Sequence, residues 1–161
     1  MEQPFDYIEM KIPAKPEYVG VMRLTLSGIA SRMGFTYEDI EDLKVAASEA
    51  CTNAVHHAYD DNEGGEVTIG FGVYENQLEV MVSDSGKSFN VQEMKKTLGP
   101  YNSLTTIDEM NEGGLGLFLI ETLMDDVKIQ SLSGVTVLMT KYLHRERVDH
   151  GEQSITTNHS E

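Results

Sequence analysis

The order of apolar periodicities along the chain most restricts the fold that it can adopt. Apolar residues recur at helical spacing over residues 17–33, and Gly34 follows the last of them. A second helical segment begins near Thr36, whose hydroxyl is a typical helix cap. Alternating apolar and polar residues then predict strands over 66–73 and 77–83, joined by a tight turn. Helices followed by an antiparallel hairpin predict an α+β unit.

The remaining pattern extends this unit at both ends. We expect a first strand over 5–12, a helix over 117–124, and a last hairpin made by 127–132 and 135–143. Residues 91–96 are expected to form a short helix. With no internal repeat and no linker in 161 residues, the sequence predicts one domain over 1–143 and a frayed polar tail over 144–161.

One segment shows neither the helical nor the strand periodicity. Residues 97–116 contain four glycines and a proline, and a loop of this length in a compact domain is usually functional or disordered. The loop ends in Gly113, Gly114 and Gly116, just before the apolar helix. Glycines that open a helix expose backbone N–H groups at its positive end, where phosphate binds well. A flexible turn would show the same glycines.

The charge of the chain excludes several functions. The formal net charge is −15, and residues 36–66 hold nine acidic side chains against Lys44 alone. Such a surface repels nucleic acids and anionic membranes, so no direct binding to either is expected. It suits a basic protein partner, or it serves only solubility; the composition leaves both open.

The same composition favours a cytoplasmic protein. No apolar run is long enough to cross a bilayer, and the first residues do not resemble a secretory signal. Cys51 is the single cysteine, so it has no partner for an intramolecular disulfide, and we expect it to be a small core residue in a reducing compartment.

The second helix carries a carboxylate in an unusual setting. The face that includes Glu49 otherwise bears small or weakly polar residues, from Val45 through Thr52 to His56, so we expect most of the helix circumference to be covered. A carboxylate there must be paired, coordinated or neutralised. Asn53 lies one turn further on, and the two side chains could hold Mg²⁺ while Glu49 takes a proton. A purely structural glutamate fits equally well.

A second carboxylate ends the predicted strand over 77–83. Alternation puts Asp84 on the same face as Val82, so its carboxylate would point into an apolar layer. There it could accept the exocyclic amino group of an adenine, and Gly86 would let the flat ring approach the backbone.

These motifs, in the order Glu49–Asn53, Asp84–Gly86 and Gly113–Gly116, resemble the nucleotide-binding boxes of the GHKL (Bergerat) superfamily. The resemblance spans nearly the whole chain. It is strongest to the anti-sigma-factor serine/threonine protein kinases, of the stress-response sigma-B type, through SEACTNAVHHAY, VSDSGKSF and GGLGLFLIETLMDDV. It implies a two-layer α/β sandwich, with helices on one face of a mixed, mainly antiparallel sheet.

The resemblance also implies roles for individual residues. Glu49 would be the general base, and Asn53 would ligate the Mg²⁺ that bridges the phosphates. Asp84 and Gly86 would contact the adenine. Gly114 and Gly116 would contact phosphate through a closing lid over 97–114. From the residues alone, Thr105 could also touch phosphate from this lid, although a polar loop contains threonines in any case.

The family's partners are proteins. The resemblance implies that the chain sequesters a sigma factor and uses ATP to phosphorylate an anti-anti-sigma protein on serine. It further implies a homodimer, and that Arg23 contacts the partners. Ser88 and Val135 stand where the family usually has glycine and threonine, which leaves the nucleotide affinity and the ring contacts open.

Other functions fit the sequence less well. A nucleotide-gated module that binds the sigma factor with little catalysis is the alternative, and it would have no need of a carboxylate at Glu49. We expect neither a histidine kinase, which would need a preceding helical hairpin, nor a topoisomerase or chaperone ATPase, which would need a following domain. The two histidines at 56 and 57 lack a second ligand pair, so zinc is not expected.

Overall fold

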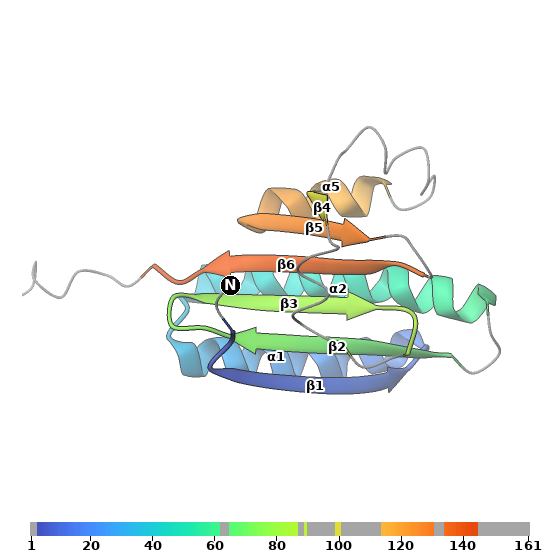
Figure 1. Cartoon of the computed structure of the whole chain (residues 1–161), viewed down its shortest axis with the longest axis horizontal. Helices are drawn as coiled ribbons and strands as arrows, with labels where there is room; N and C mark the ends of the chain where they lie inside the picture. The colour runs from blue at the N-terminus through green and yellow to red at the C-terminus, as the bar shows by residue number, and fades with distance from the viewer. Residues whose placement is uncertain are drawn as a thin grey trace, which may run out of the picture.

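A six-stranded sheet forms one layer of the protein, and the α-helices lie together on one of its faces (Figure 1). This computed structural model describes residues 3–61, 65–86, 89, 99–100, 114–130 and 134–144. In chain order its elements are β1 (Asp6–Pro13), a 3-10 helix (Pro16–Tyr18), α1 (Val19–Met33), α2 (Tyr37–Asp61), β2 (Glu66–Val73), β3 (Gln77–Ser83), β4 (Gly99–Pro100), α5 (Gly114–Leu123), β5 (Asp126–Gln130) and β6 (Thr136–Tyr142).

The strands do not follow one another in sequence order. The order across the sheet is β1-β2-β3-β6-β5-β4, and every pairing among the described strands is antiparallel. The two-layer α+β architecture is therefore confirmed, but the expectation of a mixed sheet is wrong for this part of the chain. The short strand β4 was not predicted, because two residues carry no periodicity.

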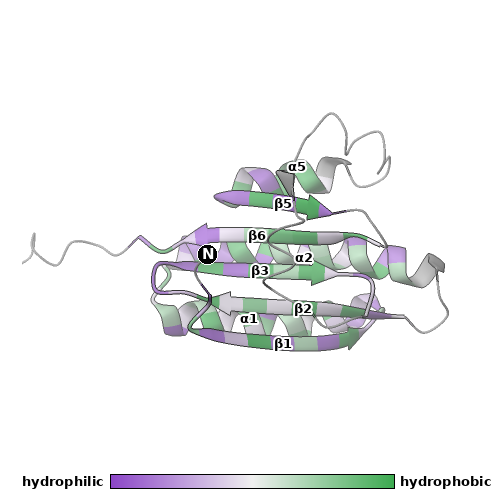
Figure 2. Ribbon diagram, viewed as in Figure 1, coloured by the Kyte–Doolittle hydropathy of each residue, from purple (hydrophilic) through white to green (hydrophobic). Residues whose placement is uncertain are grey.

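The pairing of β3 with β6 joins distant parts of the sequence. The predicted hairpin of β2 and β3 is confirmed with the expected bounds, and β6 lies on the other side of β3. Val82 of β3 is opposite Val137 of β6, so the residues that follow β3 lie beside those that precede β6. Apolar residues run along these central strands (Figure 2).

The helix ends follow from local chemistry. The Asp39 amide donates to Thr36 Oγ1 over 3.2 Å, which confirms the predicted cap of α2. Gly34 ends α1 in the left-handed conformation, with φ at 98°. The predicted helix over 117–124 begins earlier, at Gly114. The expected helix over 91–96 lies outside the described residues, and no described helix has both the length and the apolarity needed to span a membrane.

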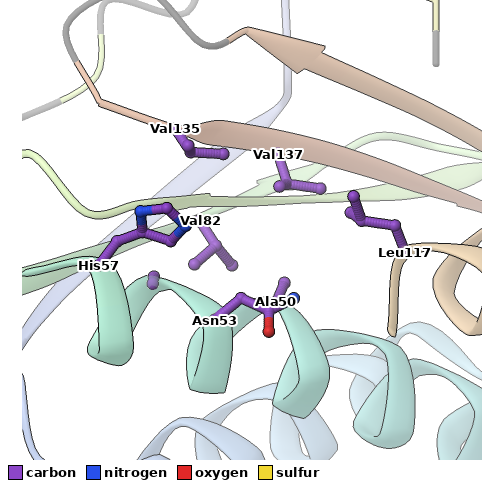
Figure 3. Close-up of a pocket in the computed structure, with 8 residues that line it drawn as sticks. Ala50, Asn53, His57, Val82, Leu117, Val135 and Val137 are labelled. Atoms are coloured by element: carbon purple, nitrogen blue, oxygen red, sulfur yellow. The ribbon is translucent and has the colours of Figure 1, made fainter. Parts of the chain in front are cut away.

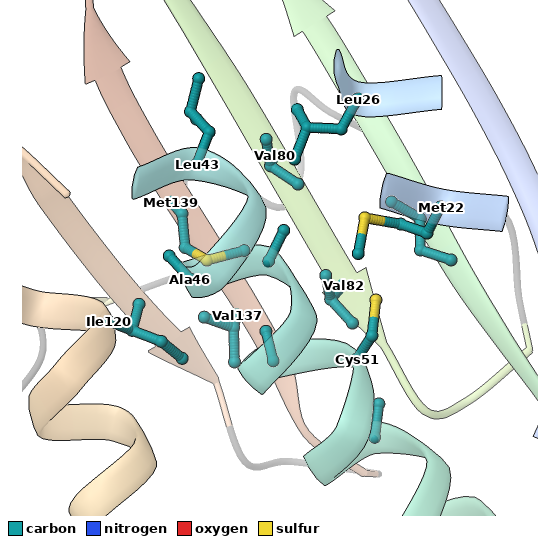
Figure 4. Packing of buried hydrophobic residues seen from close by; sticks show 14 of the residues in the cluster. Met22, Leu26, Leu43, Ala46, Cys51, Val80, Val82, Ile120, Val137 and Met139 are labelled. Atoms are coloured by element: carbon teal, nitrogen blue, oxygen red, sulfur yellow. The ribbon is translucent and has the colours of Figure 1, made fainter. Parts of the chain in front are cut away.

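The core lies between the helices and the inner face of the sheet (Figure 4). Its fully buried members come from both layers: Met22, Leu26, Leu43, Ala46, Cys51, Val80, Ile120 and Met139. Cys51 is the expected small core residue, and burial raises the pKa of its thiol to about 12. The alanines of α2 allow this long helix to pack closely against the strands beneath it.

Two glycines, Gly28 within α1 and Gly34 directly after it, test how backbone conformation contributes to stability. Nothing would crowd a Cβ at either Gly34 or Gly28, but only Gly34 has a positive φ. We expect Gly34→Ala to lower the free energy of unfolding by about 1–2 kcal/mol, the cost of a left-handed alanine. Gly28→Ala, within the helix, should raise it by about 0.5–1 kcal/mol.

Urea denaturation of the two variants measures both values. Equal effects of the two substitutions would contradict the assignment of Gly34 as a left-handed helix end.

Candidate active site

Helix α2 presents three polar side chains toward one place. Glu49, Asn53 and His57 are spaced four residues apart, so they lie on successive turns of the same face. All three are half-buried. Within the described part of the chain, Asn53 Nδ2 is buried and has no hydrogen-bond partner. Because a buried amide without a partner is costly, this face is suited to a polar ligand.

The expectation that α2 is covered on most of its circumference is confirmed over 45–55, where only Val45 and Thr52 are exposed. These two residues and His56 form one narrow solvated stripe beside Glu49, which the sequence did not predict. Small, weakly polar residues occur on a solvated helix face as readily as on a covered one. The unusual position of Glu49 therefore depends on its neighbours in space and not on the composition of its helix.

The neighbour that matters is Gly116 in the first turn of α5. A Cβ placed on Gly116 would lie 3.0 Å from Glu49 Oε2 and 3.5 Å from Asn53 Nδ2. Any larger residue would press against the Glu49 carboxylate, so glycine permits the two helices to approach here. The first motif and the third, far apart in the sequence, meet at this contact.

The open end of α5 faces this contact. Because α5 begins at Gly114, its first backbone N–H groups have no partner within the helix. They carry the positive end of the helix dipole, which favours an anion.

The second motif is held by the turn before β6. The Val135 amide donates to Asp84 Oδ1 over 2.9 Å, and the Asp84 amide donates to the Val135 carbonyl over 3.3 Å. Gly134 has φ at 98°, and a Cβ there would collide with Asp84 Oδ1. The half-buried Asp84 carboxylate is thus fixed by the backbone of the last hairpin.

This geometry clarifies the departure at Val135. The Asp84 contact is made by the backbone of residue 135, so it does not require a threonine side chain. The threonine at 136 donates instead to Ser83 Oγ, over 3.2 Å. Gly86 has φ at 71° and has room for a Cβ, so its conformation is what requires glycine. Its approach to a nucleotide ring stays a prediction.

A narrow pocket lies between α2, α5 and the paired strands (Figure 3). Its lining consists of Ala50, Asn53, Ala54, His57, Val82, Leu117, Val135 and Val137. Most of these side chains are apolar, and Asn53 and His57 are the polar ones. An apolar slot with a few polar groups is the kind of lining that small-molecule sites have.

His57 is the pocket residue that sequence reasoning missed. The two histidines were judged only as metal ligands, whereas the four-residue spacing from Asn53 places His57 on the site face of α2. No group of three metal-binding side chains occurs among the described residues. A metal ion would therefore need ligands besides Glu49 and Asn53.

Of the predicted site residues that the structure describes, Asn53 lines the pocket, and Asp84 is hydrogen-bonded to the lining residue Val135. Arg23 is exposed on α1, beside Leu24, and no residue of α1 lines the pocket. Thr105, Ser88 and nearly all of the expected lid over 97–114 lie outside the described residues.

Comparison with known proteins gives a consistent family. Residues 12–141 match the family model described as the histidine kinase-like ATPase domain. The chain is 66% identical to the serine-protein kinase RsbW of Bacillus velezensis, over 94% of each chain. It is 63% identical to the Bacillus subtilis enzyme of the same name, over 93% of this chain and 94% of that one. For the Oceanobacillus iheyensis RsbW the identity is 60%, over 95% and 97%.

A solved structure shares the fold. The RsbU and RsbW domains of a Mycobacterium tuberculosis protein match with a TM-score of 0.59 and 22% identity, over 89% of this chain. The chain spans 34% of that longer chain, and the likeness bears on the fold alone. The family model and the high-identity relatives together show that the chain belongs to the RsbW serine-protein kinases, which are built on a histidine kinase-like ATPase domain.

Proposed function

We propose that the chain is an anti-sigma factor that uses MgATP to phosphorylate a serine of an anti-anti-sigma protein, at the site formed by α2, α5 and the β3–β6 pair. The observation that carries this proposal is the contact of Gly116 with Glu49 and Asn53 beside the apolar pocket. It unites a candidate base, a candidate metal ligand and a helix N-terminus in one place.

The residues present fit a nucleotide with its metal ion. The apolar walls suit the adenine, and the Asp84 carboxylate, beside Val135, accepts its exocyclic amine. The amide oxygen of Asn53 is a hard ligand for Mg²⁺, and the Nδ2 group without a partner can donate to phosphate. The first turn of α5, at Gly114 and Gly116, donates backbone N–H groups to phosphate.

Phosphoryl transfer depends mainly on positioning and on neutralising charge. When bound, MgATP supplies the phosphoryl group and part of the neutralisation. In this proposal the Glu49 carboxylate would accept the proton of the acceptor serine as the serine oxygen bonds to phosphorus and the bond from that phosphorus to the oxygen of the leaving ADP breaks. Asn53 and the start of α5 hold the phosphates in line with that oxygen. A module that only binds the sigma factor would not need Glu49 at this position.

The partners contact the protein through an exposed face of α1. Arg23 lies there next to Leu24, which is 78% exposed. A charged side chain next to exposed apolar residues is typical of an interface hot spot. We propose that the sigma factor and the acceptor protein share this face, that the protein is a homodimer, and that it acts in the cytoplasm.

The most direct test labels the acceptor. Purified protein is incubated with labelled ATP, Mg²⁺ and a lysate of the source cell, and the labelled protein is identified by mass spectrometry. Label on serine of one small protein supports the proposal. ATP binding without any labelled protein would favour the binding module.

Base recognition is tested at Asp84. We expect wild-type protein to bind ATP at least tenfold more tightly than ITP, because ITP presents an oxygen where adenine has an amine and a mismatched buried polar group costs about 1–3 kcal/mol. Asp84→Asn keeps an acceptor for the Val135 amide but replaces the other oxygen with a donor, and it should lose most ATP binding. Calorimetry measures both.

The matched control for this prediction is Asp126→Asn, a carboxylate change on β5 away from the pocket lining. It should bind ATP as wild type does. Equal affinities of wild type for ATP and ITP would rule out Asp84 as the adenine acceptor.

Substitutions of Glu49 and Asn53 distinguish the catalytic role from the metal-binding role. Glu49→Ala should bind ATP almost normally but transfer phosphate at least a hundredfold more slowly, within the roughly 10²–10⁴-fold range of general-base catalysis. Asn53→Ala should weaken Mg²⁺-dependent binding and transfer together. Rates come from phosphorylation of the acceptor protein at saturating ATP, with Glu41→Ala on the same helix as the control. Wild-type rates for Glu49→Ala would leave that carboxylate a structural role.

The shared surface is tested at Arg23. Arg23→Ala should weaken the complexes with the sigma factor and with the acceptor protein by about 2 kcal/mol each, the usual cost of removing a hot-spot residue. A competition titration at fixed nucleotide concentration measures both affinities, and Arg32→Ala near the end of the same helix is the control. A stable ternary complex would contradict the shared surface and leave the kinase function unaffected.

A further inference from the structure

A buried lysine joins three elements at the end of the helix layer away from the pocket. Lys141 of β6 is 8% exposed, and its Nζ donates to the Leu123 carbonyl over 2.6 Å. The same Nζ lies 3.6 Å from Asp42 Oδ2 and 3.9 Å from Asp39 Oδ1. One ammonium group therefore contacts the last residue of α5 and the first two turns of α2.

Each contact has a physical reason. An ammonium group can be buried only when it has partners of opposite charge or hydrogen-bond acceptors. Leu123 ends α5, and the carbonyls at a helix C-terminus lack partners within the helix and carry its negative dipole end. The Asp39 and Asp42 carboxylates supply the opposite charge from α2. Lys141 thus attaches the end of α5 to the start of α2 and to the sheet.

The opposite end of α5 and the middle of α2 form the candidate active site. Gly116 lies in the first turn of α5, and its neighbour Glu49 lies seven residues, about two turns, beyond Asp42 on α2. With ten residues, α5 is only about 15 Å long. A shift at Leu123 is therefore transmitted along a short rigid helix to Gly116.

We propose that Lys141 is a positioning residue for the kinase reaction: by fixing the C-terminal end of α5 to α2, it holds the N-terminal end of α5 against Glu49 and Asn53. The inference rests on the proposed function of that contact as the phosphate site. Lys141 is opposite Leu78, at the other end of the β3–β6 pair from Asp84 and Val135, so it governs the binding of phosphates and not that of the base.

The experiment compares two ligands that differ in their phosphates. In the full-length protein, Lys141→Met is titrated with MgATP and with adenosine by calorimetry, and phosphorylation of the acceptor protein is timed at saturating MgATP. We expect adenosine affinity to be unchanged, MgATP affinity to fall roughly tenfold, and the transfer rate to fall about 10–100-fold, the effect of a displacement of about 1 Å at a reacting group. Lys141→Arg keeps the charge and should restore both.

The control is Lys44→Met, which removes a half-buried lysine that pairs with Glu41 on the same helix at 3.0 Å. It should behave as wild type. If Lys141→Met does not fold, Asp39→Asn/Asp42→Asn makes the same comparison from the α2 side, and it should lose MgATP affinity while keeping that for adenosine.

Three results would overturn the positioning role. They are unchanged MgATP binding and transfer in Lys141→Met, an equal loss of adenosine and MgATP affinity, and a failure of Lys141→Arg to restore the selective loss. A wild-type protein that binds adenosine but not MgATP would overturn the proposed phosphate site itself.

Discussion

The pairing of β3 with β6 is the constraint on which the site depends. It places Val82 opposite Val137, and it brings Asp84 to the backbone of Val135. These four residues come from segments more than fifty positions apart, and two of the pocket walls exist only because the strands are neighbours. Helices α2 and α5 then close the pocket from the other layer. A non-local pairing of this kind is entropically expensive, and the buried inner face of the strands offsets that cost.

Glycine has a different physical task at each of three positions around this pocket. At Gly116 a side chain would press on the Glu49 carboxylate, so absence of a Cβ allows two helices to meet. At Gly134 both the positive φ and the nearby Asp84 carboxylate exclude a side chain, and at Gly86 the positive φ alone does so. The three glycines look the same in the sequence, whereas the structure gives a separate reason against a side chain at each of them.

The sequence predicted elements that depend on neighbouring residues. It could not predict contacts between elements that are distant in the sequence. The hairpin of β2 and β3 has the predicted bounds because alternating residues and the tight turn between the strands are local signals. One stripe of α2, at Val45, Thr52 and His56, is exposed although its small, weakly polar residues predicted a covered face, because such residues do not distinguish the two settings. His57 was missed because only metal ligation was considered, although its spacing from Asn53 already placed it on the site face. The Lys141 contacts involve three elements and leave no sequence pattern at all.

The acidity of the chain sets a further requirement on the site. A protein of net charge −15 must hold a polyanion, yet distant carboxylates are screened within a Debye length of about 8 Å at physiological ionic strength. Binding is therefore decided by the groups nearest the phosphates, which in our proposal are the first turn of α5, Asn53 and a metal ion. Lys141 offsets one of the two negative charges of Asp39 and Asp42, at the start of α2, without contributing its charge to the pocket. Its ammonium group holds the helices in position, and the positive potential at the phosphates must come from the backbone dipoles of α5 and from the metal ion.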